Sequence, residues 1–322
     1  MNGQKFYKNF FSIYITLVLQ NVITLSVNLA DNLMLGSYSE TALAGVAAVN
    51  QIQFVYQQII LALGDGLVIF SSQYWGKRRI DSMKKISSAA MRAALVAAVV
   101  LFAAVSIFPY EAVRIFTEDV PIIEEGVGYL GIVRFTYLFF AVTQILLASM
   151  RSVESVKIAF RLSVMTLLVN CGINYGLIFG HFGAPCMGAQ GAAVGTLAAR
   201  VLECVVLIWY VIKKDEKLRL RLKDYLSTDK VLVWDYIKIV VPILIVQGLW
   251  GVNTALQTVI LGHMTAAAIA ANSAAATLFL VVKSAAVGAS STASVLIGKT
   301  IGTGDMGLVK RYAKKLQCLF VL

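Results

Sequence analysis

The chain has 322 residues, of which 59% are hydrophobic and only 14% are charged. Soluble domains carry roughly 25% charged residues, so this composition excludes a water-soluble globule and indicates an integral membrane protein. Four cysteines and two histidines, without a CxxC pair or a Cys/His cluster, exclude a disulfide scaffold and a structural zinc site. The formal net charge of +11 would suggest nucleic-acid binding in a soluble chain, but here the positive charge lies in the loops between apolar segments.

Eight apolar segments are long enough to cross a membrane as helices, because a hydrocarbon core of roughly 30 Å needs about 20 apolar residues. They cover residues 10–35, 42–75, 88–110, 124–149, 159–180, 186–212, 236–261 and 266–298, and a ninth begins near residue 314. Strands of a membrane barrel would show short stretches of alternating polarity, which these segments lack. The sequence therefore predicts an all-α integral membrane protein.

Lysine and arginine residues are concentrated in every second connection. They lie before the first segment and at 77–85, 151–157, 213–230 and 310–315, whereas the other connections are acidic or nearly uncharged. Positive residues close to membrane helices are retained on the cytoplasmic side, so we expect a multi-pass protein of the plasma (inner) membrane with a cytoplasmic N-terminus. No small-residue cleavage site follows the first segment, which we expect to be retained. The basic loop at 213–230 has mixed signs and lies where topology requires positive charge, which is favoured over binding of nucleic acid or anionic lipid.

The sequence contains an internal repeat. A shift of 226 residues places the segment beginning at Ala30 on the segment beginning at Leu256, and further along it places Gly76 on Gly302. Hydropathy and charge match between the copies more strongly than the letters do. Six predicted helices separate the copies, so both enter the membrane in the same direction and are expected to be related by an axis along the membrane normal.

The repeat predicts two lobes of six helices each, with the first lobe at residues 1–225, including a cytoplasmic linker from about residue 213. Residues 226–322 then make a partial second lobe of about two and a half helices, because only 96 residues follow the shift. Either the sequence is a fragment of a longer product or the gene itself is truncated.

Several motifs follow the predicted helices in chain order. The first segment ends in LADNLMLGSYSETALAGVAAVNQI, with an acid five residues before a glycine, and SQYWGK follows the second. The fifth and sixth contain LLVNCGINYGLIFGHFGAPCMGAQGAAVGTLAARV, and the seventh opens with KIVVPILIV. This combination resembles the multidrug and toxic compound extrusion (MATE) family of cation-coupled exporters along the whole chain. The resemblance implies two helical lobes around a central cavity.

Asp31 is the most informative polar residue. A carboxylate within a membrane span costs roughly 2.5–3.5 kcal/mol on insertion scales, and such residues normally face a bundle interior or a wet cavity. Either Asp31 exchanges its charge for a proton or a bound sodium ion, or it lies near the outer end of its helix and is simply solvated or paired. The resemblance implies the first, because the matching acid of that family belongs to a cation site in the N-terminal lobe.

Asn170 and Asn174 are one helical turn apart and share a face, and Thr196 offers a hydroxyl from the next segment. Together with Asp31 they form an oxygen set suited to a hard cation if the helices converge, and the resemblance implies that they do. The alternative is that the two amides only hydrogen-bond between helices. Many family members carry a second acid where this chain has Asn174, so a proton at Asp31 is as acceptable as sodium.

Other polar residues have structural or cavity-lining interpretations. Arg200 and Glu203 are three residues apart and are expected to form a structural or gating pair. Gln257 occupies in the second half the place of the first-half acid, so we expect the coupling chemistry in the first half. Gln57, Asn253 and Gln257 are the candidates for lining the substrate cavity.

We expect a transporter and not an enzyme, since no nucleophile, base and orienting group occur together. Protons or sodium ions moving inward would drive amphipathic or cationic organic compounds outward by alternating access, without a cofactor. The expected partners are a small organic molecule and the lipid bilayer, with no nucleic acid, and the protein is expected to be monomeric. Two alternatives stay open: a flippase for a lipid-linked precursor, whose cavity should be more basic, and an inactive truncated membrane fragment.

Overall fold

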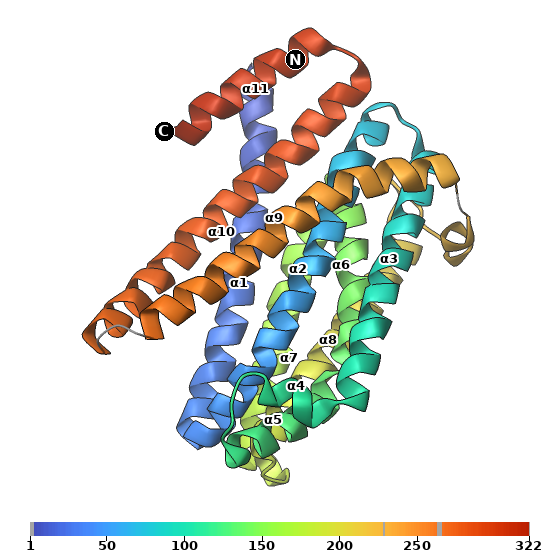
Figure 1. The fold of residues 1–322 in the computed structure, drawn as a ribbon. Coiled ribbons are helices and arrows are strands. Elements are labelled where there is room, and N and C mark those ends of the chain that lie inside the picture. The colour runs from blue at the N-terminus through green and yellow to red at the C-terminus, as the bar shows by residue number, and fades with distance from the viewer. Residues whose placement is uncertain (1–2, 228, 263–265, 322) are drawn as a thin grey trace.

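The computed structural model describes the backbone of residues 3–227, 229–262 and 266–321. Side chains are described there except at residues 3–5, 222, 226, 252, 255–262, 266–274, 276–278, 281 and 321. The elements in this part of the chain are α1 (Gly3–Tyr38), α2 (Glu40–Gly76), α3 (Ile80–Ile107), α4 (Pro109–Arg114), α5 (Val120–Val133), α6 (Thr136–Ser152), α7 (Lys157–Phe179), the 3₁₀ turn η1 (His181–Gly183), α8 (Gly188–Lys213), η2 (Leu222–Leu226), α9 (Lys230–Gly262), α10 (Ala266–Thr303) and α11 (Met306–Val321) (Figure 1). The predicted all-α fold is confirmed.

Six of the described helices are each long and apolar enough to cross a membrane: α1, α2, α3, α7, α8 and α9. A seventh crossing is made by α5 and α6 together, which are bent by 53° at the break between them. These crossings correspond to the first seven predicted segments, and α10 covers the eighth. The fourth segment was expected as one helix, so the break is a difference from the prediction. Arg134 lies at the break, and its guanidinium lies 5.3 Å from the ring centre of Phe135.

The last helix also differs from the prediction. It begins at Met306, before the expected start near residue 314, and its buried residues Tyr312 and Leu316 pack against Phe6 and Phe10 at the start of α1. Lysines and arginines occupy its other faces, so this amphipathic helix covers the end of α1.

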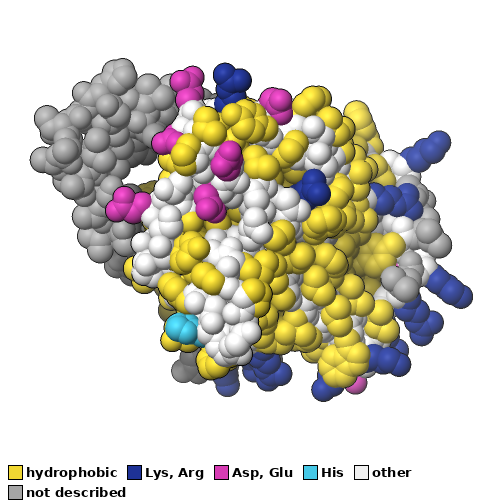
Figure 2. Space-filling model, turned by 90° about the horizontal axis from the view of Figure 1, so that it is seen from below, with side chains coloured by type: hydrophobic (Ala, Val, Ile, Leu, Met, Phe, Trp, Pro, Cys, Tyr) yellow, Lys and Arg dark blue, Asp and Glu magenta, His cyan; other side chains and the backbone are white. Residues whose placement is uncertain are grey.

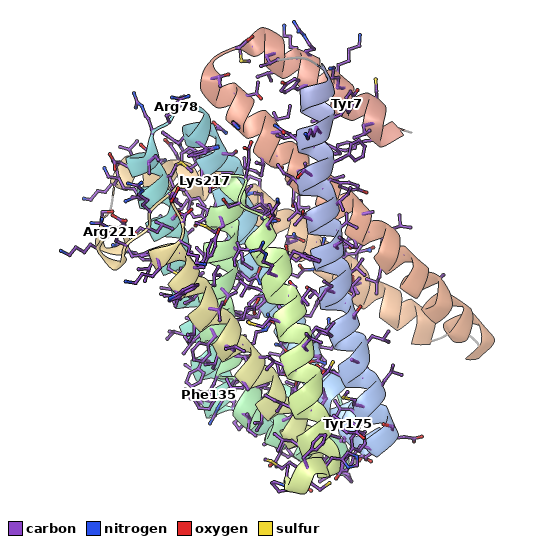
Figure 3. The ribbon with its side chains drawn as sticks, turned by 180° about the vertical axis from the view of Figure 1, so that it is seen from behind. Tyr7, Arg78, Phe135, Tyr175, Lys217 and Arg221 are labelled. Atoms are coloured by element: carbon purple, nitrogen blue, oxygen red, sulfur yellow. The ribbon has the colours of Figure 1, made fainter. Side chains whose placement is uncertain are left out.

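The two ends of the bundle differ in charge. Figure 3 shows Arg78, Lys217 and Arg221 at the end where α1 begins, and Tyr175 toward the opposite end. We call these the basic end and the acidic end; viewed from the acidic end, Figure 2 shows acidic side chains gathered around an apolar surface. At the basic end the linker after α8 is tied to α3 by Lys85, whose hydrogen bond holds the pKa of Asp229 below its ordinary value. The predicted alternation of charge thus follows the two ends of the bundle, while their orientation in the cell stays a prediction.

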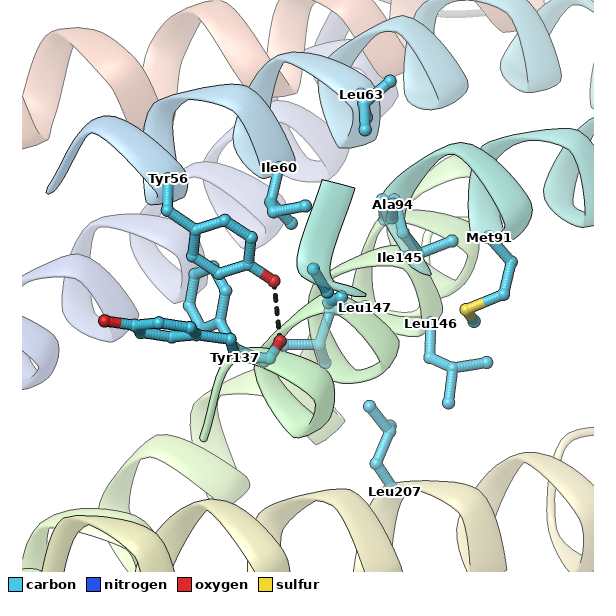
Figure 4. Packing of buried hydrophobic residues seen from close by; sticks show 14 of the residues in the cluster. Tyr56, Ile60, Leu63, Met91, Ala94, Tyr137, Ile145, Leu146, Leu147 and Leu207 are labelled. Carbon is cyan, nitrogen blue, oxygen red and sulfur yellow. Dashed lines mark hydrogen bonds between the residues drawn. The ribbon is translucent and has the colours of Figure 1, made fainter. Parts of the chain in front are cut away.

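Helix α2 lies at the centre and contacts α1, α3, α5, α6, α9 and α10. Its neighbours are joined to it by tyrosine hydroxyls that donate to backbone carbonyls: Tyr56 to Tyr137 of α6 at 2.6 Å, and Tyr236 of α9 to Leu63 at 2.7 Å. Figure 4 shows the first of these bonds inside a cluster of buried aliphatic side chains. A buried hydroxyl needs such a partner, so each tyrosine adds a directional link to the apolar packing.

Helices α2 and α10 meet through reciprocal contacts at the basic end. A Cβ atom on Gly76 would overlap the carbonyl oxygen of Lys299, and one on Gly302 would overlap the carbonyl oxygen of Gln73. Gly302 follows Gly76, and Lys299 follows Gln73, by the same 226 residues that relate the two copies of the repeat. Reciprocal contacts between equivalent residues are the signature of a two-fold axis. The proposed division into lobes at residues 225 and 226 is a prediction that this symmetry supports at one contact.

Candidate functional site

Three helices bring the predicted cation-site residues together. The amide nitrogen of Asn174 on α7 donates to the carboxylate of Asp31 on α1 at 2.7 Å and to the side-chain oxygen of Asn170 at 3.3 Å. The amide nitrogen of Asn170 donates in turn to the hydroxyl of Thr196 on α8 at 3.4 Å. Asn170 and Asn174 are buried, and Asp31 is partly buried. We call these four residues the Asp31 network.

Glycines allow α7 and α8 to approach closely enough for this network. A Cβ atom on Gly195 would overlap the side-chain oxygen of Asn174, and one on Gly191 would lie 2.7 Å from the carbonyl oxygen of Leu177. The turn between the helices is set by Gly180, which has a left-handed φ of 73°. The GLIFG and GAQGAAVG motifs therefore act by positioning the two asparagines against α8.

The Asp31 network borders a polar pocket of about 310 Å³ formed by α1, α2, α5, α7 and α8. Within the described part of the chain, Asp31 is the carboxylate that lines this pocket and Arg200 is the cation. Two oxygens near the pocket, Asn174 Oδ1 and Thr166 Oγ1, are buried without a hydrogen-bond partner among the described residues. Unpartnered oxygens beside a carboxylate can accept from a proton donor or coordinate a hard cation.

Arg200 forms the predicted pair with Glu203 at 2.8 Å, and its guanidinium lies 5.2 Å from the ring centre of Phe140. Glu203 is buried, so the pair neutralises a charge that would be costly alone. Arg200 also faces the pocket that contains Asp31. It therefore sets the local potential at that carboxylate, which sequence reasoning did not anticipate.

A second pocket, of about 470 Å³, lies where α1, α2, α6 and α7 meet α9 and α10; we call it the central pocket. Many of its lining residues form pairs 226 positions apart in the chain: Gln20 and Val246, Asn21 and Gln247, Thr24 and Trp250, Phe54 and Leu280, Gln57 and Lys283, Gln58 and Ser284, Leu61 and Val287, and Asp65 and Ser291. Equivalent positions of both copies thus surround one cavity, as a two-fold axis through it requires.

The cavity-lining predictions have different outcomes. Gln57 lines both pockets. Asn253 is exposed and is absent from the lining of either pocket among the described residues, and Gln257 lies outside the described side chains. Two charged residues of the central pocket, Arg151 and Lys283, were missed as cavity residues. Carrying Gln57 forward by the repeat shift leads to Lys283, so the signal was present in the sequence.

Comparison with known proteins gives the family. A family model described as MatE matches residues 17–176, about half of the chain. The chain belongs to the MATE family. It is 26% identical over 198 residues to the probable multidrug resistance protein NorM of Thermotoga maritima, which covers 61% of this chain and 42% of that relative. It is 27% identical over 296 residues to the probable NorM of Rhizobium meliloti, which covers 90% of this chain and 62% of the relative.

Solved structures agree with the fold. An outward-facing conformation of a multidrug resistance MATE family transporter superposes with a TM-score of 0.83, and MATE in the bent conformation superposes with 0.86. Each covers 96% of this chain and 68% of the other at 16% identity, so the likeness concerns the fold. This MATE-family chain is therefore a multi-pass membrane protein of a transporter family, and it spans about two fifths to two thirds of the length of the curated relatives named above.

Proposed function

We propose that this MATE-family protein is an antiporter of the plasma membrane, with a cytoplasmic N-terminus, that exports amphipathic or cationic organic compounds in exchange for inward-moving protons or sodium ions. The relatives named as multidrug resistance proteins support export of organic compounds. The observation that carries the coupling is the Asp31 network, in which a membrane-embedded carboxylate meets two buried amides and a hydroxyl.

The charge balance of the pocket favours a proton as the coupling ion. Asp31 and Arg200 together leave the described pocket lining neutral when Asp31 is ionised. A bound sodium ion would then add an uncompensated positive charge beside Arg200, whereas a proton would remove the charge of Asp31 and leave only that of Arg200, which Glu203 already pairs. Ion and substrate drive exchange when they favour different states of the lobes, which is the basis of alternating access.

The direct test is efflux of a fluorescent dye from cells under an imposed ion gradient, with the intact protein and its Asp31→Asn variant. Asp31→Asn should abolish gradient-driven efflux because the amide cannot exchange a proton. Asp81→Asn is the matched control, since Asp81 is exposed at the start of α3 and away from both pockets. Unchanged efflux in Asp31→Asn would contradict the coupling role.

A second variant addresses the ion. Asn174→Asp places a second acid beside Asp31 at 2.7 Å from its carboxylate in the present geometry. Two carboxylates so close favour binding of a cation between them. We expect Asn174→Asp to make efflux more dependent on sodium, and a variant whose efflux is unaffected by sodium would argue against this site as the place where the ion binds.

A further inference from the structure

The central pocket has an unequal distribution of charge between its two halves. Asp65 lies 3.7 Å from Arg151, and Arg151 also donates to the hydroxyl of Ser291 at 3.3 Å. These two charges offset one another. Lys283 remains, and among the described residues no carboxylate lies within 4.0 Å of its ammonium group. The pocket lining therefore carries one positive charge in excess.

The repeat shows that this excess is a property of one half. Position 283 corresponds to Gln57 in the first copy, and position 291, a serine, corresponds to Asp65. The second half thus gains a cation and lacks an anion relative to the first. A symmetric pocket would have been neutral at both positions.

The aromatic surface of the pocket is also arranged around this cation. The ammonium group of Lys283 lies 3.9 Å from the ring centre of Trp250, directly over its face. A cationic organic compound would bind that face through its positive charge, but Lys283 already occupies it and repels a second cation. The remaining lining supplies amide groups, including Gln57, Gln144 and Gln247, and aliphatic side chains for an apolar body.

We propose that the central pocket selects an amphipathic organic anion, with a carboxylate or sulfonate group at Lys283 and a flat apolar body beside Trp250. This inference rests on the proposed function, because it names the class of compound that the exporter would take among the amphipathic and cationic ones. Lys283 is then a specificity-determining residue. A volume of about 470 Å³ accommodates a compound of several fused rings.

The test compares two probes with the same body, 1-pyrenesulfonate and 1-pyrenemethylammonium, in fluorescence titrations of the intact protein in neutral detergent. No ion gradient is needed, so binding is measured independently of transport. We expect the wild type to bind the sulfonate about tenfold more tightly than the ammonium compound, Lys283→Gln to lose this preference, and Lys283→Glu to reverse it. Lys283→Arg should keep it, because the charge is retained.

Lys238→Gln is the matched control. Lys238 lies over the ring of Trp234 at 5.6 Å, so it is also a lysine paired with a tryptophan on α9, but it is exposed and outside the central pocket. Its removal should leave the probe preference unchanged. A wild-type protein that binds the ammonium probe more tightly would overturn the proposal, and so would a Lys283→Gln protein that retains the preference for the sulfonate. If Lys283→Gln does not fold, the wild-type comparison alone decides.

The outcomes separate this inference from the proposed function. Preference for the anion without any gradient-driven efflux would remove the antiporter proposal and leave the pocket assignment. Efflux coupled to a gradient, together with a pocket that prefers the cation, would leave the antiporter and remove the assignment.

Discussion

Replacing Gly195 by alanine tests the geometry that assembles the Asp31 network. The new Cβ atom would overlap the side-chain oxygen of Asn174 and lie 3.0 Å from its amide carbon. The amide must therefore rotate away, which breaks its bonds to Asp31 and Asn170. A hydrogen bond to a charged group contributes about 1.5–3 kcal/mol and a neutral one about 0.5–1.5 kcal/mol, so the local loss is about 2–4 kcal/mol. Helix propensity returns up to about 1 kcal/mol when alanine replaces glycine.

The assay is thermal unfolding of the purified intact protein, with efflux measured in parallel. Gly172→Ala is the matched control, because Gly172 lies on α7, is exposed, and a Cβ atom added to it would have no described neighbour within 4 Å outside its own helix backbone. We expect Gly195→Ala to unfold at a lower temperature than wild type and to lose coupled efflux, while Gly172→Ala is neutral or slightly more stable. In an Asn174→Ala background the Gly195→Ala change should cost little, since no amide is left to displace. Equal stability and coupling of Gly195→Ala and Gly172→Ala would refute the reasoning.

Two further predictions concern the basic end. Lys299 holds Glu154 through contacts of 2.8 and 2.9 Å, but both groups are partly exposed, so the pair contributes about 0.5–1 kcal/mol and its loss should shift the equilibrium between lobe states about two- to fivefold. Charge reversal at either residue should increase thiol labelling of a Ser291→Cys probe from the basic end, and the double reversal should restore the wild-type rate; no restoration would argue against the pair as a closing contact. Asp215 accepts from three backbone N–H groups of the linker at 2.9–3.3 Å, so Asp215→Ala should speed hydrogen exchange across residues 215–220, whereas Glu216→Ala, at an exposed neighbour, should not.

The sequence determined the features that depend on neighbouring residues. Apolar length set the membrane helices, and the distribution of lysine and arginine set which connections share an end of the bundle. The spacing of Asn170 and Asn174 placed both amides on one face because a helical turn takes 3.6 residues. The repeat shift of 226 residues was also readable, and it pairs the two glycines that meet between α2 and α10.

Other features needed the tertiary structure. The break at Arg134 and the early start of α11 lie within segments whose hydropathy alone predicted something simpler. Asp31 reaches Asn174 across 143 residues of chain, and the separation of such side chains depends on how closely whole helices pack. Hydrophobic periodicity records which face of a helix is buried, but it does not record the neighbour that the face meets or the distance between them. That distance depends on Gly195, and only the packed bundle shows which atom the missing side chain of this glycine leaves room for.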